Sequence, residues 1–308
     1  MRLNEPLQHG DETAVQELSE SLMNELVGAV GLPKTDLTRS IMRFLAGKPA
    51  TFLARFGVTF DRIVVEQGLP AACEWGLSFF CNPAELRIED EIPQKGPLLI
   101  AATHPGAYDV LLYTATIKRK DIRWIATEIP FLQLLPKVSN HIFYVDRVDL
   151  SSRARALRDI VEHLKSGGAM IYLISGHRDP DPANFAGAES GMDNLLPVYD
   201  LFFNKVPDLK VQPALASGIV TKRWSNHLIT KIRRDQIDRQ RLAEFGQVIT
   251  QLLNPGKLLV TTAVSFGKAV SRDELLQMNP GLTTHEAMVQ MCKELLRNHA
   301  RHFGFQLR

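Results

Sequence analysis

Residues 97–109 read PLLIAATHPGAYD, and this stretch decides the fold class. The apolar run LLIAA predicts a short buried strand, and Pro105 predicts the first turn of a helix, where proline is favoured. His104 would then lie at the carboxyl end of a strand, where open α/β sheets bind their ligands. Asp109 follows five positions later. Residues five apart in one helix point in different directions, so the two side chains can meet only if His104 precedes the regular helix.

Strands and helices alternate along the rest of the chain after Pro83. The pattern predicts strands at 86–89, 98–102, 123–127, 142–146, 169–174, 211–216 and 257–265. It predicts helices at 151–165, 192–204 and 237–253, followed by two closing helices. We therefore expect an α/β fold with a mixed, mostly parallel sheet flanked by helices.

The N-terminal part has a different pattern. Apolar residues spaced three or four apart predict an amphipathic helix over 11–30, with Val15, Leu18, Leu22, Leu26 and Val30 on one stripe. A second helix is expected after Pro33, ending at Gly47. Residues 1–84 are thus predicted to be a small helical module and 85–308 the α/β domain. The apolar stripe is more typical of intramolecular core than of membrane contact.

Composition excludes several classes of protein. With 36 basic and 34 acidic residues, the net charge of +2 gives no reason to expect nucleic acid as a partner. Three cysteines without ligand spacing argue against a disulfide framework and against a structural zinc, so no metal is expected. The polar, acidic N-terminus is not a secretory signal, and no apolar run approaches the roughly 18 to 20 residues that span a bilayer. We expect a cytoplasmic protein whose membrane contact, if any, is peripheral.

His104 and Asp109 are a candidate catalytic pair. A carboxylate on one ring nitrogen fixes the tautomer and orientation of the imidazole, so the other nitrogen can take a proton from an attacking hydroxyl. An isolated pair with this spacing is more often a helix-capping histidine beside a solvated acid. The pair therefore needs support from other motifs.

Three further motifs supply this support. The segments HPGAYD (104–109), FYVDR (143–147), YLISGHRDPDP (172–182) and VQPALA (211–216) occur in this order. Together they resemble the four blocks of the glycerolipid acyltransferase family, which joins an activated acyl chain to glycerol-3-phosphate or to its monoacyl product. The resemblance covers about residues 86–270. It implies acyl transfer with His104 as base and Asp109 as its partner.

The third block separates subgroups of this family. Membrane-bound lysophosphatidate acyltransferases carry a Phe-Pro-Glu-Gly-Thr-Arg type sequence, whereas Ser175 stands here at the glutamate position. The Ser-Gly-x-Arg-Asp run is similar to that of soluble plastid-type glycerol-3-phosphate acyltransferases, which also carry a helical N-terminal module. This likeness implies glycerol-3-phosphate as acceptor, acyl-carrier protein or acyl-CoA as donor, and no cofactor. Transfer to a lysophosphatidate or another polar lipid, and a non-catalytic lipid-binding relative, remain alternatives.

One position departs from the plastid-type pattern. That pattern has a second arginine directly after Arg-Asp, where this chain has Pro180. Arg147 and Arg178 remain as predicted phosphate ligands, since guanidinium groups bind phosphate through paired hydrogen bonds. Arg147 could equally form a structural ion pair. Lys222 and Arg223 are candidates to replace the lost charge.

Other residues of these blocks are predicted to line the substrate site. Ser175 and Gly176 follow a strand, and Gly176 would let backbone N–H groups approach a carbonyl or phosphate closely. Thr103 is expected to cap the following helix, with donation of a hydrogen bond in the site as the alternative. Pro213 is expected to shape the acyl or acceptor pocket.

Two basic clusters are candidate docking surfaces for an acidic carrier protein or for anionic lipid head groups. The first comprises Lys118, Arg119, Lys120 and Arg123, and the second comprises Lys222, Arg223, Lys231, Arg233, Arg234, Arg239 and Arg241. Either cluster could instead be ordinary solvated surface. His299 and His302 are interpreted as surface residues without a metal role. No G-x-S-x-G elbow occurs, which argues against a serine hydrolase.

Overall fold

The computed structural model describes residues 11–29, 36–146 and 148–308. Its seven-stranded sheet has the order β1-β7-β6-β2-β5-β3-β4. All neighbouring strands are parallel except β6 and β7. The strands are β1 (Glu85–Ile88), β2 (Leu98–Ala102), β3 (Arg123–Thr127), β4 (Ile142–Val145), β5 (Ala169–Leu173), β6 (Lys210–Ser217) and β7 (Ala263–Phe266). The predicted α/β fold with a mixed, mostly parallel sheet is confirmed.

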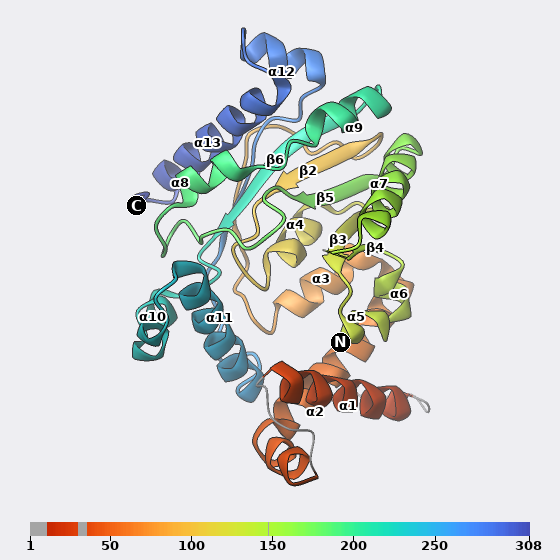
Figure 1. The fold of residues 1–308 in the computed structure, drawn as a ribbon, viewed down its shortest axis with the longest axis vertical. Helices are drawn as coiled ribbons and strands as arrows, with labels where there is room; N and C mark the ends of the chain where they lie inside the picture. The colour runs from red at the N-terminus through yellow and green to blue at the C-terminus, as the bar shows by residue number, and fades with distance from the viewer. Residues whose placement is uncertain (1–10, 30–35, 147) are drawn as a thin grey trace.

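Helices cover both faces of this sheet (Figure 1). The longer ones are α1 (Asp11–Ala29), α2 (Asp36–Gln67), α3 (Leu69–Leu77), α4 (Asp109–Ile117), α7 (Leu150–Lys165), α9 (Tyr199–Lys205), α11 (Gln236–Leu253), α12 (Arg272–Met278) and α13 (Thr284–His302). Short helical turns are α5 (Pro130–Gln133), α6 (Pro136–Ser139), α8 (Ala188–Gly191), η1 (Met192–Asn194), α10 (Lys222–Ser225) and η2 (Leu228–Ile232).

Successive side chains of the central strands point to opposite faces of the sheet, and this divides the core into two layers. Leu98, Ile100 and Ala102 of β2 face a cluster that contains α1, α2, α3 and α4. Leu99 and Ala101 face a second cluster built from α7, α9 and α13. Because both faces are covered, β2 is apolar at every position, as is typical of parallel sheets.

The strand predictions hold except at the last strand. The bounds of β2 and β3 match the prediction, β4 and β5 differ by one residue at one end, and β1 and β6 differ by one residue at both ends. The predicted strand at 257–265 is wrong over 257–262, since β7 begins only at Ala263. The predicted helix at 192–204 is interrupted, with a turn at Met192–Asn194 and a helix from Tyr199, because Pro197 lies between them.

The predicted end of the second helix at Gly47 is also wrong. Helix α2 continues to Gln67 and contains Pro49. An aromatic cluster holds its second half, where Phe56 stacks on Trp75 of α3 with ring centroids 5.0 Å apart. Tertiary packing of this kind outweighs the local cost of glycine and proline in a helix.

The N-terminal helices share a hydrophobic cluster with the sheet. Leu18 of α1 and Phe60 of α2 belong to the same cluster as Ala102 of β2 and Val264 of β7. The division into 1–84 and 85–308 stays a prediction. No helix in the described ranges is both long enough and apolar enough to cross a bilayer.

Candidate active site

The chain between β2 and α4 is a turn, and this corrects the helix start expected at Pro105. Helix α4 begins at Asp109, and residues 103–108 have no helical structure. The Asp109 carboxylate accepts the backbone N–H of Gly106 at 2.9 Å and that of Val110 at 2.6 Å. By accepting hydrogen bonds from N–H groups that precede and follow it in the chain, this carboxylate stabilises the turn before the helix. The expected role of Thr103 as a helix cap is wrong, because its hydroxyl contacts Tyr113 instead.

This turn brings the predicted pair together. His104 Nδ1 lies 2.9 Å from Asp109 Oδ2, and Asp109 is 1% exposed while the His104 side chain is 25% exposed. Within the described residues His104 Nε2 has no hydrogen-bond partner. Burial of the ring lowers the pKa of His104, but the charge and the hydrogen bond of Asp109 outweigh burial and raise that pKa above the ordinary histidine value. The geometry is that of an oriented general base with one free nitrogen.

The backbone of His104 is fixed by the loop that follows β5. The N–H of His104 donates to Asp179 Oδ2 at 2.7 Å, and the N–H of Asp179 donates to the carbonyl of His104 at 2.9 Å. Burial raises the pKa of Asp179, while the hydrogen bond from His104 acts in the opposite direction. The first and third sequence blocks are therefore joined directly.

Helix α11 buries a polar face against the turn after β2 and the loop after β5. This face was not predicted from the sequence. This face consists of Gln240, Glu244, Gln247 and Gln251. Gln240 Nε2 donates to the carbonyl groups of Pro105 at 2.7 Å and Asp179 at 2.8 Å, so it binds the first and third blocks at once. The spacing of four, three and four residues is the signal that could have revealed this face, because it repeats along one helical stripe.

A buried carboxylate connects the third block to the end of β6. Asp181 accepts the N–H of Gly218 and of Val220, each at 3.0 Å. Burial raises the pKa of Asp181 to about 6. The same connection brings Ile219 against Gly106, where an added Cβ atom would lie 2.1 Å from Ile219 Cγ2. Glycine is therefore required in the turn after His104 because of this close approach.

Arg178 directly precedes Asp179, which binds the His104 backbone, and Arg178 already forms an ion pair. Its guanidinium lies 3.0 Å from the carboxylate of Glu244 on α11. Burial raises the pKa of Glu244, and the Arg178 charge opposes this shift. The Arg178 charge also lowers the pKa of His104, which opposes the effect of Asp109. The structure thus places Arg178, a predicted phosphate ligand, in the loop that is hydrogen-bonded to the His104 backbone.

Ser175 and Gly176 form the tight turn after β5. The Ser175 hydroxyl is buried and donates to the carbonyl of His177 at 2.9 Å. Gly176 has a positive φ of 69°, a conformation that glycine adopts without strain. An added Cβ atom there would lie 3.1 Å from Leu196. Both residues lie in the loop that ends at Asp179.

Among the described residues, none of the other predicted ligands forms a hydrogen bond or ion pair with His104 or Asp109. Arg147 lies outside the described residues. Lys222 and Arg223 are exposed on α10, beyond the carboxyl end of β6, and neither has an ion-pair partner in the described ranges. Pro213 is buried within β6, opposite Ala101 of β2, and packs beside Gly267. It therefore faces the α13 side of the sheet.

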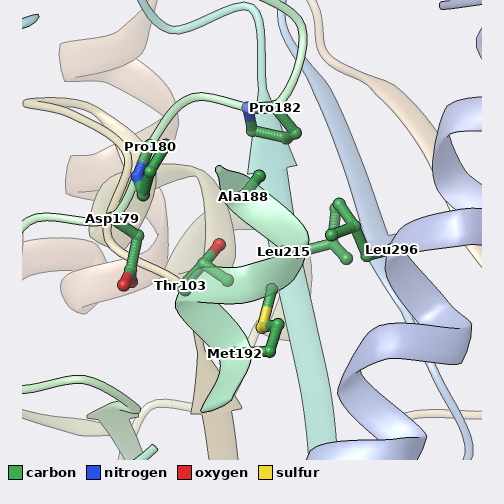
Figure 2. Close-up of a pocket in the computed structure, with 9 residues that line it drawn as sticks. Thr103, Asp179, Pro180, Pro182, Ala188, Met192, Leu215 and Leu296 are labelled. Atoms are coloured by element: carbon green, nitrogen blue, oxygen red, sulfur yellow. The ribbon is translucent and has the colours of Figure 1, made fainter. Parts of the chain in front are cut away.

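A small cavity lies under the third-block loop (Figure 2). Asp179 and Thr103 provide its polar atoms, and Pro180 and Pro182 line it from the loop. The rest of its lining is mainly apolar, with Ala188, Gly191, Met192, Leu215 and Leu296. Pro213 is not among the lining residues. This cavity places an apolar space next to the carboxylate that holds the His104 backbone.

Two surface interpretations are corrected. Arg119 of the first basic cluster is 4% exposed and binds Asp121 together with the carbonyl groups of Gly96 and Gly167. Arg119 therefore links the amino ends of β2 and β5, whereas His104 follows the carboxyl end of β2. His299 is fully buried, between the hydroxyls of Ser217 at 2.8 Å and Ser265 at 2.7 Å, and burial lowers its pKa to about 3.

No group of three or more metal-ligating side chains gathers anywhere in residues 11–29, 36–146 and 148–308.

Comparison with known proteins identifies one family signal. The family model described as Acyltransferase matches residues 84–196, a range that includes the first three sequence blocks. This part of the chain is therefore similar to acyltransferase domains. The crystal structure of a 1-acyl-sn-glycerophosphate acyltransferase from Thermotoga maritima aligns with 97% of this chain and 100% of its own, at 14% identity and a TM-score of 0.44. No curated protein sequence matches the chain.

Proposed function

We propose that this protein transfers a fatty acyl chain from an acyl thioester to the 1-hydroxyl of glycerol-3-phosphate. The observation that carries the proposal is the 2.9 Å contact between His104 Nδ1 and Asp109, with Nε2 left open. The acyltransferase match over residues 84–196 supports the reaction class. The acceptor and the donor rest on the resemblance of the third block to the plastid-type subgroup.

In the proposed reaction His104 acts as general base. Nε2 takes the proton of the acceptor hydroxyl as its oxygen attacks the thioester carbonyl, and Asp109 stabilises the imidazolium that forms. Collapse of the tetrahedral intermediate breaks the C–S bond, and the imidazolium returns the proton to the leaving thiolate. No covalent enzyme intermediate is needed. No cofactor takes part, and acyl-carrier protein or acyl-CoA is a co-substrate.

Backbone N–H groups of the turn are proposed to stabilise the negative charge of the intermediate. The N–H groups of Ala107 and Tyr108 form no hydrogen bond within the described residues and lie at the amino end of α4. Donors in this position, together with the helix dipole, favour an anion. The Gly106 N–H cannot serve because it binds Asp109.

Arg178 is proposed to bind the acceptor phosphate. Since its guanidinium already contacts Glu244, a phosphate would share this cation with a buried carboxylate. Lys222, Arg223 and Arg147 are proposed as the other cations of the acceptor site. Ser175 and Gly176 are proposed to shape its loop, and Pro213 to support the sheet beneath it.

A polar lipid such as a lysophosphatidate is the second candidate acceptor. Pro180 stands where the plastid-type pattern has an arginine, and it lines an apolar cavity rather than carrying charge. Both acceptors carry a phosphate, but with fewer cations the acceptor site would bind more through apolar contacts, which only the acyl chain of a lysophosphatidate can supply. An acceptor panel distinguishes the two candidates.

The test is acceptor-dependent thiol release by the purified full chain, assayed with acyl-CoA and with acyl-carrier protein. We expect release to require glycerol-3-phosphate and to fall by about 10²–10⁴-fold in His104→Ala. His302→Ala is the matched control, because His302 is exposed at the end of α13 and should leave the rate unchanged. Near-native turnover by His104→Ala, or no turnover with any acceptor in the wild type, would reject the proposal.

A further inference from the structure

A surface turn between β6 and α11 combines exposed aliphatic side chains with positive charge. Leu228 and Ile232 on η2 are 75% and 71% exposed, and Ile229 between them is 45% exposed. Single exposed aliphatic residues are common, but three within one five-residue turn form a patch that water solvates poorly. We name residues 222–234 the basic–aliphatic turn.

The charge of this turn is strongly one-sided. Its basic residues are Lys222, Arg223, Lys231, Arg233 and Arg234, and it contains no acidic residue. All five are exposed, and none forms an ion pair with another described residue. Cations without an ion-pair partner, placed around exposed aliphatic side chains, are suited to bind an anionic lipid bilayer, which presents negative charge above an apolar interior.

The position of the turn relates it to the candidate active site. Strand β6 runs parallel to β2, so the turn and His104 emerge at the same edge of the sheet. Helix α11 contacts both parts, since it packs against α10 and η2 and its Gln240 binds the carbonyl of Pro105 next to His104. Figure 1 places α10 and α11 beyond the carboxyl end of β6.

We infer that the basic–aliphatic turn docks the protein on an anionic lipid surface. Its cations contact negatively charged head groups while Leu228, Ile229 and Ile232 enter the boundary of the acyl chains. An acidic protein would be attracted by the same charge, but exposed aliphatic side chains at the tip favour a lipid boundary. The inference goes beyond the proposed reaction, because it concerns where the protein binds and not what it transfers.

The experiment is flotation of the full chain with vesicles of phosphatidylcholine, with and without phosphatidylglycerol. We expect binding to the phosphatidylglycerol vesicles and much weaker binding to neutral ones. The triple change Lys231→Glu, Arg233→Glu and Arg234→Glu should weaken binding roughly tenfold or more. The double change Leu228→Asp and Ile232→Asp should abolish it at low salt. Lys222 and Arg223 stay intact because they are candidate acceptor ligands.

Matched controls carry the same changes elsewhere. Met278 and Leu282 are exposed near α12, at the top of Figure 1, and both should tolerate change to aspartate without loss of binding. Lys118 and Lys120 are exposed at the amino ends of β2 and β5. Their change to glutamate should have little effect on vesicle binding. Far-ultraviolet circular dichroism of each variant separates loss of binding from loss of folding.

Three outcomes would overturn the inference. They are equal binding to neutral and anionic vesicles, vesicle binding that survives both sets of changes in the turn, and loss only of acyl-carrier-protein binding in these variants. The last result would assign the turn to a carrier protein. His104→Ala should bind vesicles like the wild type, so failure of the lipid inference and failure of the proposed reaction are seen in different measurements.

Discussion

Asp179 forms two hydrogen bonds with the backbone of His104, whose imidazole contacts Asp109 instead. Its carboxylate accepts the His104 N–H at 2.7 Å, and its own N–H donates to the His104 carbonyl at 2.9 Å. The turn that carries the candidate base is thus fixed by a residue 75 positions away in the sequence.

Asp179→Ala should lower kcat more than it raises KM. It removes the acceptor of a buried N–H group, which costs about 1–3 kcal/mol and loosens the His104 turn. Asp179→Asn is the matched variant, because its side-chain oxygen can still accept this hydrogen bond. Steady-state kinetics and thermal unfolding of both variants test the prediction. Equal kinetics in Asp179→Ala and the wild type would contradict it.

The rate should rise with pH as His104 loses its proton. Because Asp109 raises the pKa of His104, the midpoint of this rise should lie above the ordinary histidine value of about 6.5. Asp109→Asn removes the negative charge that counteracts the effect of burial on the pKa of His104. The midpoint should therefore move to lower pH while the maximal rate falls. A pH–rate profile of the two proteins measures both effects. A midpoint that does not move would show that Asp109 does not control this titration.

The same pKa shift affects stability with a defined sign. The folded protein holds the His104 proton more tightly than the unfolded chain, so this contribution is fully present below about pH 6.5 and is lost as the pH rises through the folded-state pKa. In Asp109→Asn this contribution should disappear. Urea unfolding on both sides of this pH range checks the sign.

Glu244→Gln should lower the KM for a phosphate-bearing acceptor. The change removes the charge that occupies Arg178 while keeping the size of the side chain, so the cation becomes available to the acceptor. We expect a several-fold decrease of KM for glycerol-3-phosphate and no decrease for an uncharged acceptor. Arg178→Ala should act in the opposite direction. A KM that is unchanged in both variants would remove Arg178 from the acceptor site.

Gly106→Ala should destabilise the protein by about 1–3 kcal/mol and reduce kcat. The new methyl group would lie 2.1 Å from Cγ2 of the fully buried Ile219, so the turn after His104 must move. Gly191→Ala is the control, since its Cβ atom would meet only Pro180 at 3.7 Å. Adding Ile219→Ala to Gly106→Ala should restore part of the lost rate. Full activity of Gly106→Ala alone would show that the close approach of Gly106 to Ile219 does not position the turn after His104.

Local sequence patterns predicted most of the sheet. Strands β2 and β5 are apolar at every position because both faces are covered, and such runs are recognisable without structural information. The helix start at Pro105 was mispredicted for an equally local reason. Proline favours the first turn of a helix, but Asp109 binds the N–H groups of Gly106 and Val110 and begins the helix at its own position.

The candidate site was only partly predictable. His104, Asp109 and Arg178 could be named because their blocks occur in a recognisable order. Glu244 and Gln240 could not, because polar residues on a helix are usually solvated and only packing shows that α11 turns this face inward. His299 was misplaced for the same reason, since two serine hydroxyls from β6 and β7 satisfy its ring inside the core.

The sequence by itself determined the alternation of strands and helices and the identity of the candidate base and its carboxylate. The alternation follows from hydrophobic patterns that act within a few residues of one another, and the pair was identified from its spacing together with the order of the four blocks along the chain. Only the tertiary structure decided that Asp179 fixes the His104 backbone and that Arg178 is paired with Glu244. These contacts join residues that are far apart in the chain, and they form because the sheet brings the carboxyl ends of β2, β5 and β6 to one edge, where α11 packs against them.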